Sequence, residues 1–469
     1  MKKFFLSTLL VLSAVASTHA QEEQEFTPIY KYRICLKDKK GTAFSVKHPE
    51  KFLSQKSIER RRKQKLKVNK TDLPVSQVYL NDIQATGVTI LSTSKWNNTV
   101  LVQTTDTTLI DQIAAFKFVT NTKRVAIYTK PEKKSGINRF SRIVNDSVPR
   151  YTPMPISTRY SQYDSIHNVY GLANRQIEQI NGAPLHEKGY RGKGMTIAVI
   201  DGGFYNADII PMLKDVNILG TKDFVTPGGN VYENESHGMM VLSCMATNSP
   251  NLFVGTAPEA SYWLLRSEDG GSEQIVEEDN WAAAIEFADS VGADVVNTSL
   301  GYSILDRKED NVKYWEMDGH QHISSNSASM MASKGMILCN SAGNEASKAW
   351  KLISVPADAE DVLTVGAVTP AGVNTLFSSL GNSSDGRIKP DVMSQGEYCT
   401  VMNVDGTITH ANGTSFASPI LCGMVACYWQ AHRELTAMEV IDAIRQMSDR
   451  FEEPDNIFGY GVPDFSLKF

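Results

Sequence analysis

The chain has 469 residues, of which 42% are hydrophobic and 21% charged, and its formal net charge at pH 7 is −5. A chain of this length can bury a large apolar core without disulfide staples. The slightly acidic balance argues against a nucleic-acid partner, and no stretch beyond the N-terminus is long and apolar enough to cross a membrane. We therefore expect a globular protein that does not bind nucleic acid and has no membrane span.

The first twenty residues have the pattern of an export signal. Two lysines follow Met1, an apolar core runs from Phe4 to Ala16, and the small residue Ala20 precedes Gln21. The apolar core is too short to span a membrane, and glutamine instead of a lipid-accepting cysteine follows the expected cleavage point. Residues 1–20 are thus predicted to be a signal peptide, and the protein to be exported by secretion or into a periplasm.

Residues 21–130 are predicted to form a small separate domain. Its expected elements, in chain order, are a strand at Ile29–Leu36, a helix at Val75–Thr86, strands at Val88–Ser94 and Thr99–Gln103, a helix at Thr107–Phe116 and a strand at Val119–Tyr128. The order β-α-β-β-α-β is typical of the α+β ferredoxin-like fold. The basic run Lys56–Lys70 is inserted after the first strand. Because it lacks interleaved aromatics, we interpret it as a solvated helix face and not as a nucleic-acid-binding segment.

A polar linker at 131–168 is expected to separate this domain from a larger one at 169–469, and to contain the maturation cleavage site. In the larger domain strands alternate with helices. The expected strands are Met195–Ile200, Ser261–Arg266, Asp294–Thr298, Met336–Ser341 and Val362–Val368, with a helix at Glu278–Val291. This alternation predicts an α/β fold, a mainly parallel sheet with helices on both faces.

Three polar residues mark the ends and beginnings of these elements. Asp201 closes the strand Met195–Ile200, and His237 and Ser415 each begin a segment with helical spacing. A serine hydroxyl attacks only when a base takes its proton, and histidine has a pKa suited to that role. A buried carboxylate can hold the other ring nitrogen. The order Asp, His, Ser therefore predicts a nucleophilic triad in the order found in subtilisin.

Asn344 supplies the group that such a triad still needs. It follows the strand Met336–Ser341 and the flexible residue Gly343. Its side-chain amide could donate to the oxyanion of a tetrahedral intermediate, with the Ser415 backbone N–H as the second donor.

Six short motifs share a spacing pattern that resembles the subtilases, the subtilisin-like serine endopeptidases. They are Gly192–Gly194, Gly255–Ala260, Asn297–Gly301, Ser341–Asn344, Lys389–Val392 and Gly413–Pro419. The resemblance runs from about Tyr170 to the C-terminus. It implies Asp201, His237 and Ser415 as the catalytic triad and Asn344 as the oxyanion residue of a secreted endopeptidase.

The resemblance also implies where the substrate binds. Ser299, Leu300 and Gly301 would form an edge strand that pairs with the substrate backbone, and Ala342 and Gly343 would form the facing wall of the main specificity pocket. Glycine in both walls predicts an open slot. We expect broad cleavage after large apolar or aromatic residues, with a minor component after lysine or arginine.

By the same resemblance, residues 21–130 would be an inhibitor-like propeptide that assists folding and blocks the cleft of the zymogen until it is removed. A permanently attached accessory domain is the alternative. An esterase or lipase is disfavoured, because Ser415 lacks a Gly-x-Ser-x-Gly elbow. A non-catalytic binding protein on a protease fold stays open. Two positions depart from the family pattern, Gly202 after the aspartate and Met239 after His-Gly.

Other features give weaker signals. Four of the six cysteines, Cys244, Cys339, Cys422 and Cys427, fall in expected core elements, so we expect mostly free, buried thiols. His320 and His322 lie in the polar stretch Ser303–Ser327, which we interpret as a solvated loop and not as a metal site. No cofactor is expected for the chemistry. The resemblance implies possible structural calcium, with no assignable ligands, and we expect a monomer.

Overall fold

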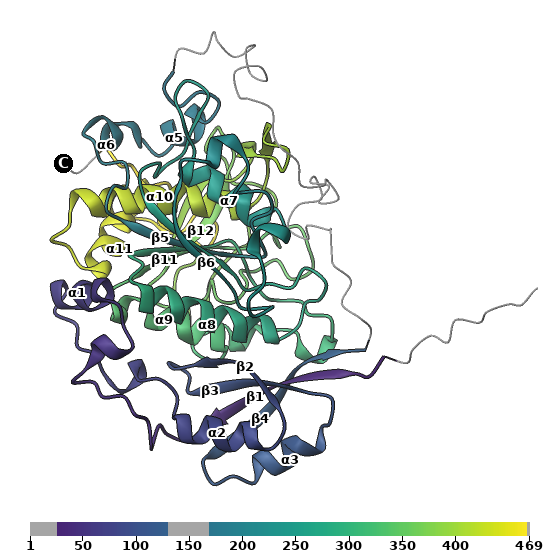
Figure 1. The fold of residues 1–469 in the computed structure, drawn as a ribbon. Coiled ribbons are helices and arrows are strands. Elements are labelled where there is room, and N and C mark those ends of the chain that lie inside the picture. Colours follow the sequence, from purple (N-terminus) through teal and green to yellow (C-terminus); the bar gives the residue numbers. More distant parts are fainter. Residues whose placement is uncertain (1–25, 130–167, 467–469) are drawn as a thin grey trace, which may run out of the picture.

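The computed structural model describes residues 26–129 and 168–466, which form a small N-terminal unit packed on a larger one (Figure 1). The predicted signal peptide and nearly all of the predicted linker lie outside the described residues. No helix in the described ranges is long and apolar enough to cross a membrane.

The N-terminal unit is an antiparallel sheet with the strand order β2-β3-β1-β4. Its elements are β1 (Ile29–Leu36), α2 (Gln77–Ala85), β2 (Thr89–Ser94), β3 (Thr99–Thr104), α3 (Thr108–Ala114) and β4 (Val119–Tyr128). The two helices cover one face of the sheet and enclose an apolar core that includes Ile34, Ile83, Val100 and Ile113 (Figure 1). The predicted order of elements is confirmed, and β1 and β4 have the predicted bounds.

The segment between β1 and α2 differs from its prediction. It contains the helical turns η1 (Pro49–Lys51) and η2 (Lys70–Asp72) and the helix α1 (Gln55–Lys63), which lies against the larger unit (Figure 1). The predicted solvated helix face is wrong for Arg60 and Arg61, whose relative exposures are 5% and 2%. Both arginines are buried because the larger unit supplies carboxylate and carbonyl partners for them.

The larger unit is built on a seven-stranded sheet in the order β13-β12-β11-β10-β5-β9-β6, and its paired strands run parallel. The strands are β5 (Thr196–Asp201), β6 (Asn217–Asp223), β9 (Ser261–Arg266), β10 (Val295–Thr298), β11 (Ile337–Ser341), β12 (Leu363–Val368) and β13 (Val392–Gln395). The predicted parallel α/β sheet is confirmed. Every residue of β5 is buried, as expected for a strand covered on both faces.

Helices cover both faces of this sheet (Figure 1). On one side lie α7 (His237–Ala246) and α10 (Thr414–Ala431), and on the other lie α8 (Val276–Val291) and α9 (Ile323–Met330). Apart from short helical turns, the other elements described are α5 (Asn174–Glu178), α6 (Ala183–Glu187), α11 (Ala437–Gln446) and the short ladders β7–β8 (Asn248–Ser249, Phe253–Val254) and β14–β15 (Cys399–Met402, Ile408–Ala411). The open face of the N-terminal sheet rests on α8 and α9 (Figure 1).

The cysteines and the histidine pair complete the comparison with the sequence. All six cysteines are free, and five of them are buried.

The predicted solvated loop around the two histidines is only half right. His320 is exposed, but His322 has 16% side-chain exposure and lies 3.0 Å from the Glu278 carboxylate of α8. The loop is drawn inward because Glu278 also accepts hydrogen bonds from Ser324, at the start of α9.

Candidate active site

Asp201 and His237 form a buried pair at the carboxyl end of the sheet. Asp201 is the last residue of β5 and His237 is the first of α7. The Nδ1 atom of His237 lies 2.8 Å and 3.0 Å from the two carboxylate oxygens of Asp201. Both side chains have 0% exposure, so water does not compete for this contact. The carboxylate therefore fixes the ring orientation and holds Nδ1 as the protonated nitrogen.

Glycines allow α7 to begin this close to β5. A Cβ atom on Gly238 would lie 2.5 Å from the Gly203 carbonyl oxygen and 2.7 Å from the Cβ of Asp201. A Cβ on Gly202 would lie 2.9 Å from a Glu235 carboxylate oxygen, which gives a packing reason for the glycine where the family pattern has serine or threonine. Without these side chains, His237 can approach Asp201 to hydrogen-bond distance.

Ser415 lies at the start of α10, directly before a residue whose ring contacts the histidine. The ring centroid of Phe416, the next residue, is 5.8 Å from that of His237. Two hydrogen bonds fix this helix end to the segment after β10. The Ser299 hydroxyl donates to the Ser415 carbonyl at 2.8 Å, and the Ser415 hydroxyl donates to the Ser299 carbonyl at 3.4 Å. The structure therefore brings all three sequence-predicted triad residues into one region.

The amide of Asn344 is oriented by a residue that sequence reasoning missed. Its Oδ1 accepts from the backbone N–H of Thr414 at 2.9 Å and from the Thr414 hydroxyl at 3.0 Å. With the oxygen engaged, the amide nitrogen is the free end. A Cβ built on Gly413 would lie 3.6 Å from both Asn344 Nδ2 and Ser415 N. The missing side chain thus leaves space where two N–H donors converge. Thr414 precedes the serine in its motif, which was the available signal.

The two expected walls of the specificity pocket meet at Ser354. A Cβ on Gly301 would lie 2.0 Å from the Ser354 hydroxyl oxygen, and one on Gly343 would lie 3.1 Å from it. Tyr302, directly after the first wall, exchanges backbone hydrogen bonds with Val355 at 2.8 Å and 3.1 Å. The Ser354 hydroxyl therefore lies next to the space that both glycines leave, a position that no local sequence motif indicated.

Leu300 and Ala342 do not present free side chains to this slot. Leu300 has 2% exposure and belongs to the apolar cluster beneath α8. Ala342 is fully buried in a cluster with Leu101 and Ala126 of the N-terminal unit and with Tyr302. In addition, the N–H of Ile127 donates to the Gln274 side chain at 2.9 Å. The last strand of the N-terminal unit therefore shares an apolar cluster with Ala342, a residue expected to bind substrate.

Glu268 is a buried acid that the sequence did not single out. Its carboxylate accepts hydrogen bonds from the Tyr302 hydroxyl at 2.8 Å and from the Ser267 hydroxyl at 2.6 Å. Burial raises the pKa of Glu268 to about 8, which the two hydroxyl donors counteract only in part. The backbone N–H of Ser267 donates to the Asp201 carbonyl at 3.1 Å, so this acid is joined to the strand that carries Asp201.

The described residues contain no cluster of side chains suited to a metal site. Within residues 26–129 and 168–466, no group of three or more His, Cys, Asp or Glu side chains could hold a metal ion. The structure assigns no ligands for the calcium that the resemblance allowed.

Two family descriptions match the chain in the same two regions. One, described as the subtilase family, matches residues 192–461, which is more than half of the chain. The other, described as the peptidase S8 propeptide domain of Bacteroidota, matches residues 31–139. The N-terminal unit is thus a propeptide domain, and the protein is made as a zymogen.

Characterised relatives agree with this assignment. Subtilisin NAT of Bacillus subtilis subsp. natto is 29% identical over 331 residues, covering 69% of this chain and 78% of the relative. Subtilisin of Bacillus pumilus is 30% identical over 273 residues, covering 57% and 88%. Serine protease AprX of Bacillus subtilis (strain 168) is 26% identical over 379 residues, covering 71% and 80%.

Among solved structures, the fold is similar to that of MycP1 with its N-terminal propeptide removed. The TM-score is 0.50 at 24% identity, and the match covers 62% of this chain and 94% of that one. At this identity the likeness supports the fold alone. Taken with the family match and the relatives, it leaves one assignment: the chain belongs to the subtilase family of serine endopeptidases.

Proposed function

We propose that Asp201, His237 and Ser415 are the catalytic triad of this endopeptidase, and that Asn344 and the Ser415 N–H form its oxyanion hole. The observation that carries the proposal is the buried contact of 2.8 Å between His237 Nδ1 and Asp201, next to the start of α10. This contact leaves Nε2 as the ring nitrogen that can accept a proton.

The reaction then follows from the positions of these groups. The Ser415 hydroxyl transfers its hydrogen bond from the Ser299 carbonyl to His237 Nε2, loses its proton to that nitrogen and attacks the peptide carbonyl carbon. The negative charge on the carbonyl oxygen is stabilised by Asn344 Nδ2 and Ser415 N. His237 next donates the proton to the leaving amine, and water hydrolyses the acyl-enzyme by the same steps in reverse.

The substrate would lie extended between the two pocket walls. Backbone hydrogen bonds along Ser299–Gly301 tolerate most sequences, which supports broad specificity. The glycines at 301 and 343 contribute no side chain to the slot, and the Ser354 hydroxyl lies next to the space that both leave. We propose cleavage after large apolar or aromatic residues.

Maturation is proposed to remove residues 21–130 by a self-catalysed cut within 131–168, after export directed by residues 1–20. The support is the packing of β4, whose Val125 and Ala126 lie in one apolar cluster with Tyr302 and Ala342. While β4 occupies this position, it excludes a substrate from the same surface. The propeptide is thus proposed as an intramolecular inhibitor.

A pair of serine variants tests the triad. Ser415→Ala should abolish peptide hydrolysis and labelling by a fluorophosphonate probe. Ser418→Ala makes the same chemical change one helical turn later, where the hydroxyl donates to Asn297, and should remain labelled. Near-normal hydrolysis by mature Ser415→Ala would refute the assignment. A folded wild-type protein that neither labels nor hydrolyses any member of a peptide library would instead favour the binding-protein alternative.

A further inference from the structure

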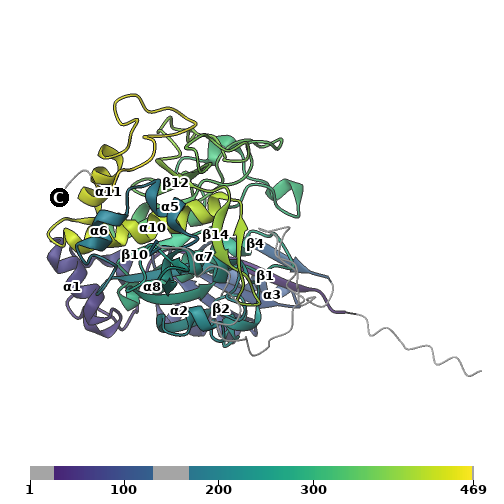
Figure 2. The same cartoon turned by 90° about the horizontal axis from the view of Figure 1, so that it is seen from above.

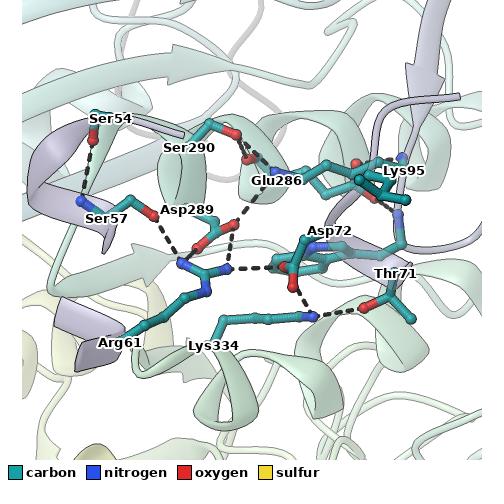
Figure 3. A network of polar contacts seen from close by, with 12 residues as sticks. Ser54, Ser57, Arg61, Thr71, Asp72, Lys95, Glu286, Asp289, Ser290 and Lys334 are labelled. Carbon is teal, nitrogen blue, oxygen red and sulfur yellow. Dashed lines mark hydrogen bonds and ion pairs between the residues drawn. The ribbon is translucent and has the colours of Figure 1, made fainter. Parts of the chain in front are cut away.

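A buried cluster of charges joins the propeptide to the peptidase domain far from the substrate cleft. It is built around Asp289 of α8 (Figure 3). One oxygen of this carboxylate lies 2.5 Å from the Arg60 guanidinium and 2.8 Å from that of Arg61, and Arg61 also contacts the other oxygen at 2.9 Å. Exposure of the three side chains is 3%, 2% and 0%, so solvent does not screen the contact.

Within this cluster, each unit supplies partners for charged side chains of the other. The peptidase domain provides a cation as well, Lys334, whose ammonium lies 3.0 Å from the carboxylate of Asp72 in the propeptide (Figure 3). Arg61 lies 3.0 Å from the same Asp72 oxygen, and Lys95 lies 3.4 Å from Asp289. Each unit thus supplies charges of both signs that the other neutralises. The peptidase domain should therefore bind its own propeptide more tightly than a segment that carries two arginines but no counterpart of Asp72.

Asp289 is ionised throughout the neutral range. Burial alone would raise its pKa, but Lys95, Arg61 and Arg60 hold it well below the ordinary value. The Asp289 carboxylate therefore keeps its negative charge across the neutral range. Salt should weaken it, because separation exposes the cationic and anionic surfaces to solvent ions.

Further contacts extend the attachment along the segment 54–72, which we call the basic arm. The backbone N–H of Ser54 donates to Ser290 at 2.9 Å, and Lys56 lies 2.9 Å from Asp294. The amide of Gln64 donates to the Gly335 carbonyl and accepts from the N–H of Ala437, both at 2.9 Å. The basic arm thus contacts three separate parts of the peptidase domain.

The basic arm and β4 contact opposite ends of α8. Val276, in the apolar cluster with β4, and Asp289, at the arginine pair, are thirteen residues apart on α8, about 20 Å along the helix axis. Figure 2 likewise shows α1 at one end of the molecule and the ends of β1 and β4 toward the other. A cut after β4 therefore leaves every contact of the basic arm intact.

We propose that the basic arm is a second anchor, which retains the propeptide on the peptidase domain after the connection at 131–168 is cut. The α8 surface around Asp289 is in this view a binding site for a propeptide as a separate chain. The proposal builds on the proposed maturation but concerns retention alone.

The test uses the full chain carrying Ser415→Ala, which by the proposed mechanism cannot cut itself. A recognition sequence for a site-specific protease is inserted within 131–168, the cut is verified on a gel, and the pieces are followed by gel filtration in 0.15 M and 1 M NaCl. The parent should co-elute in low salt and separate in high salt. Arg60→Ala/Arg61→Ala should dissociate at least about tenfold faster, because it removes the two closest buried partners of the Asp289 carboxylate.

The matched control lies in the same run of basic residues. Arg62 and Lys63 are exposed, so Arg62→Ala/Lys63→Ala removes the same charge and should keep the parent's residence time. Equal residence times for the two double variants would overturn the proposal. If Arg60→Ala/Arg61→Ala does not fold before the cut, Lys56→Ala/Gln64→Ala removes half-buried contacts of the same arm and should also dissociate faster; an unchanged residence time there would equally overturn it.

This readout does not depend on catalysis, so it separates the anchor from the proposed function. In a cut chain with Ser415 intact, co-elution together with full peptidase activity would refute inhibition by the propeptide while leaving the anchor in place. Separation of the pieces in the parent at low salt would refute the anchor and leave the triad untouched.

Discussion

Asn344 is the residue whose proposed role depends most on how its side chain is oriented. Asn344→Ala should lower kcat by roughly 10²–10³ with little change in KM, the range known for loss of such a donor in subtilisin. The amide would meet a negative charge only in the transition state, so its loss should not affect substrate binding. Steady-state kinetics on one peptide measures both constants. An effect confined to KM would contradict the role.

Thr414 should affect the same step through Asn344, as a positioning residue. Its hydroxyl donates to Asn344 Oδ1 at 3.0 Å, and Thr414→Val removes that donor while keeping the shape of the side chain. We expect a fall in kcat of about tenfold, consistent with one lost hydrogen bond to a buried group. Thr414→Ser keeps the hydroxyl and should restore most of the rate. Equal losses in the two variants would indicate that packing, and not the hydrogen bond, matters here.

Gly301 is expected to form one wall of the specificity pocket, and its contact with Ser354 determines which variant can test this role. Enlarging this residue alone would drive a Cβ to 2.0 Å from the Ser354 hydroxyl, so the substitution must be paired with Ser354→Gly. Gly301→Ala/Ser354→Gly should favour smaller residues before the cut bond than Ser354→Gly alone does, because the added methyl group fills the space that the single variant leaves open. A peptide library read by mass spectrometry measures the preference. An unchanged preference in the double variant would refute the proposed pocket wall.

At the scale of elements, the helices α8 and α9 are joined by an ion pair that should make the fold sensitive to alkaline pH. Burial lowers the pKa of His322, but Glu278, 3.0 Å away, raises it to about 9. Because the folded-state pKa exceeds the ordinary value, protonated His322 stabilises the fold fully below about pH 6.5, and the contribution is lost as pH rises through 9. The difference between 6.5 and about 9 corresponds to about 3 kcal/mol.

His322→Gln in the Ser415→Ala background should therefore lower Tm most near pH 6.5, and the difference from the parent should shrink toward pH 10. Thermal unfolding followed by circular dichroism across this range measures the effect. His320→Gln is the matched control, because that ring is 54% exposed and should change Tm little at any pH. A pH-independent difference for His322→Gln would show that lost packing is the cause.

An element could be predicted where the residues that determine it lie within its own segment, and not where they lie far along the chain. The β-branched and aromatic residues that favour a strand lie within Ile29–Leu36 and Val119–Tyr128 themselves, so β1 and β4 were predicted with their observed bounds. The burial of Arg61 depends on Asp289, 228 positions away, and no local pattern contains that pairing. A run of basic residues looks the same in sequence whether its partner is water or a distant carboxylate.

The same reasoning separates the predictable and unpredictable parts of the site. Motifs record residues that share a short segment, and Thr414 could have been found next to Ser415 for that reason. Ser354 lies next to two glycines from different segments, and only the folded sheet brings the three residues together. Residues whose roles depend on contacts between distant segments could not be predicted from the sequence.

At the scale of the whole molecule, the two attachments of the propeptide predict two separable steps of activation. The cut within 131–168 should proceed at a rate that the basic arm does not control, whereas the appearance of activity should wait for the arm to release. Wild-type protein is therefore expected to show a lag between the cut, followed on a gel, and peptide hydrolysis. In Arg60→Ala/Arg61→Ala the lag should shorten at least about tenfold, because the buried contacts with Asp289 are gone.

Salt offers an independent way to shorten the same lag. Raising NaCl from 0.15 M to 1 M should shorten it in the wild type and in Arg62→Ala/Lys63→Ala, and should have little further effect once Arg60 and Arg61 are replaced. Activity of the fully matured enzyme must be measured at both salt concentrations, so that any effect on catalysis is divided out. If hydrolysis rises in step with the cut in the wild type, release of the basic arm does not limit activation, and β4 alone accounts for inhibition.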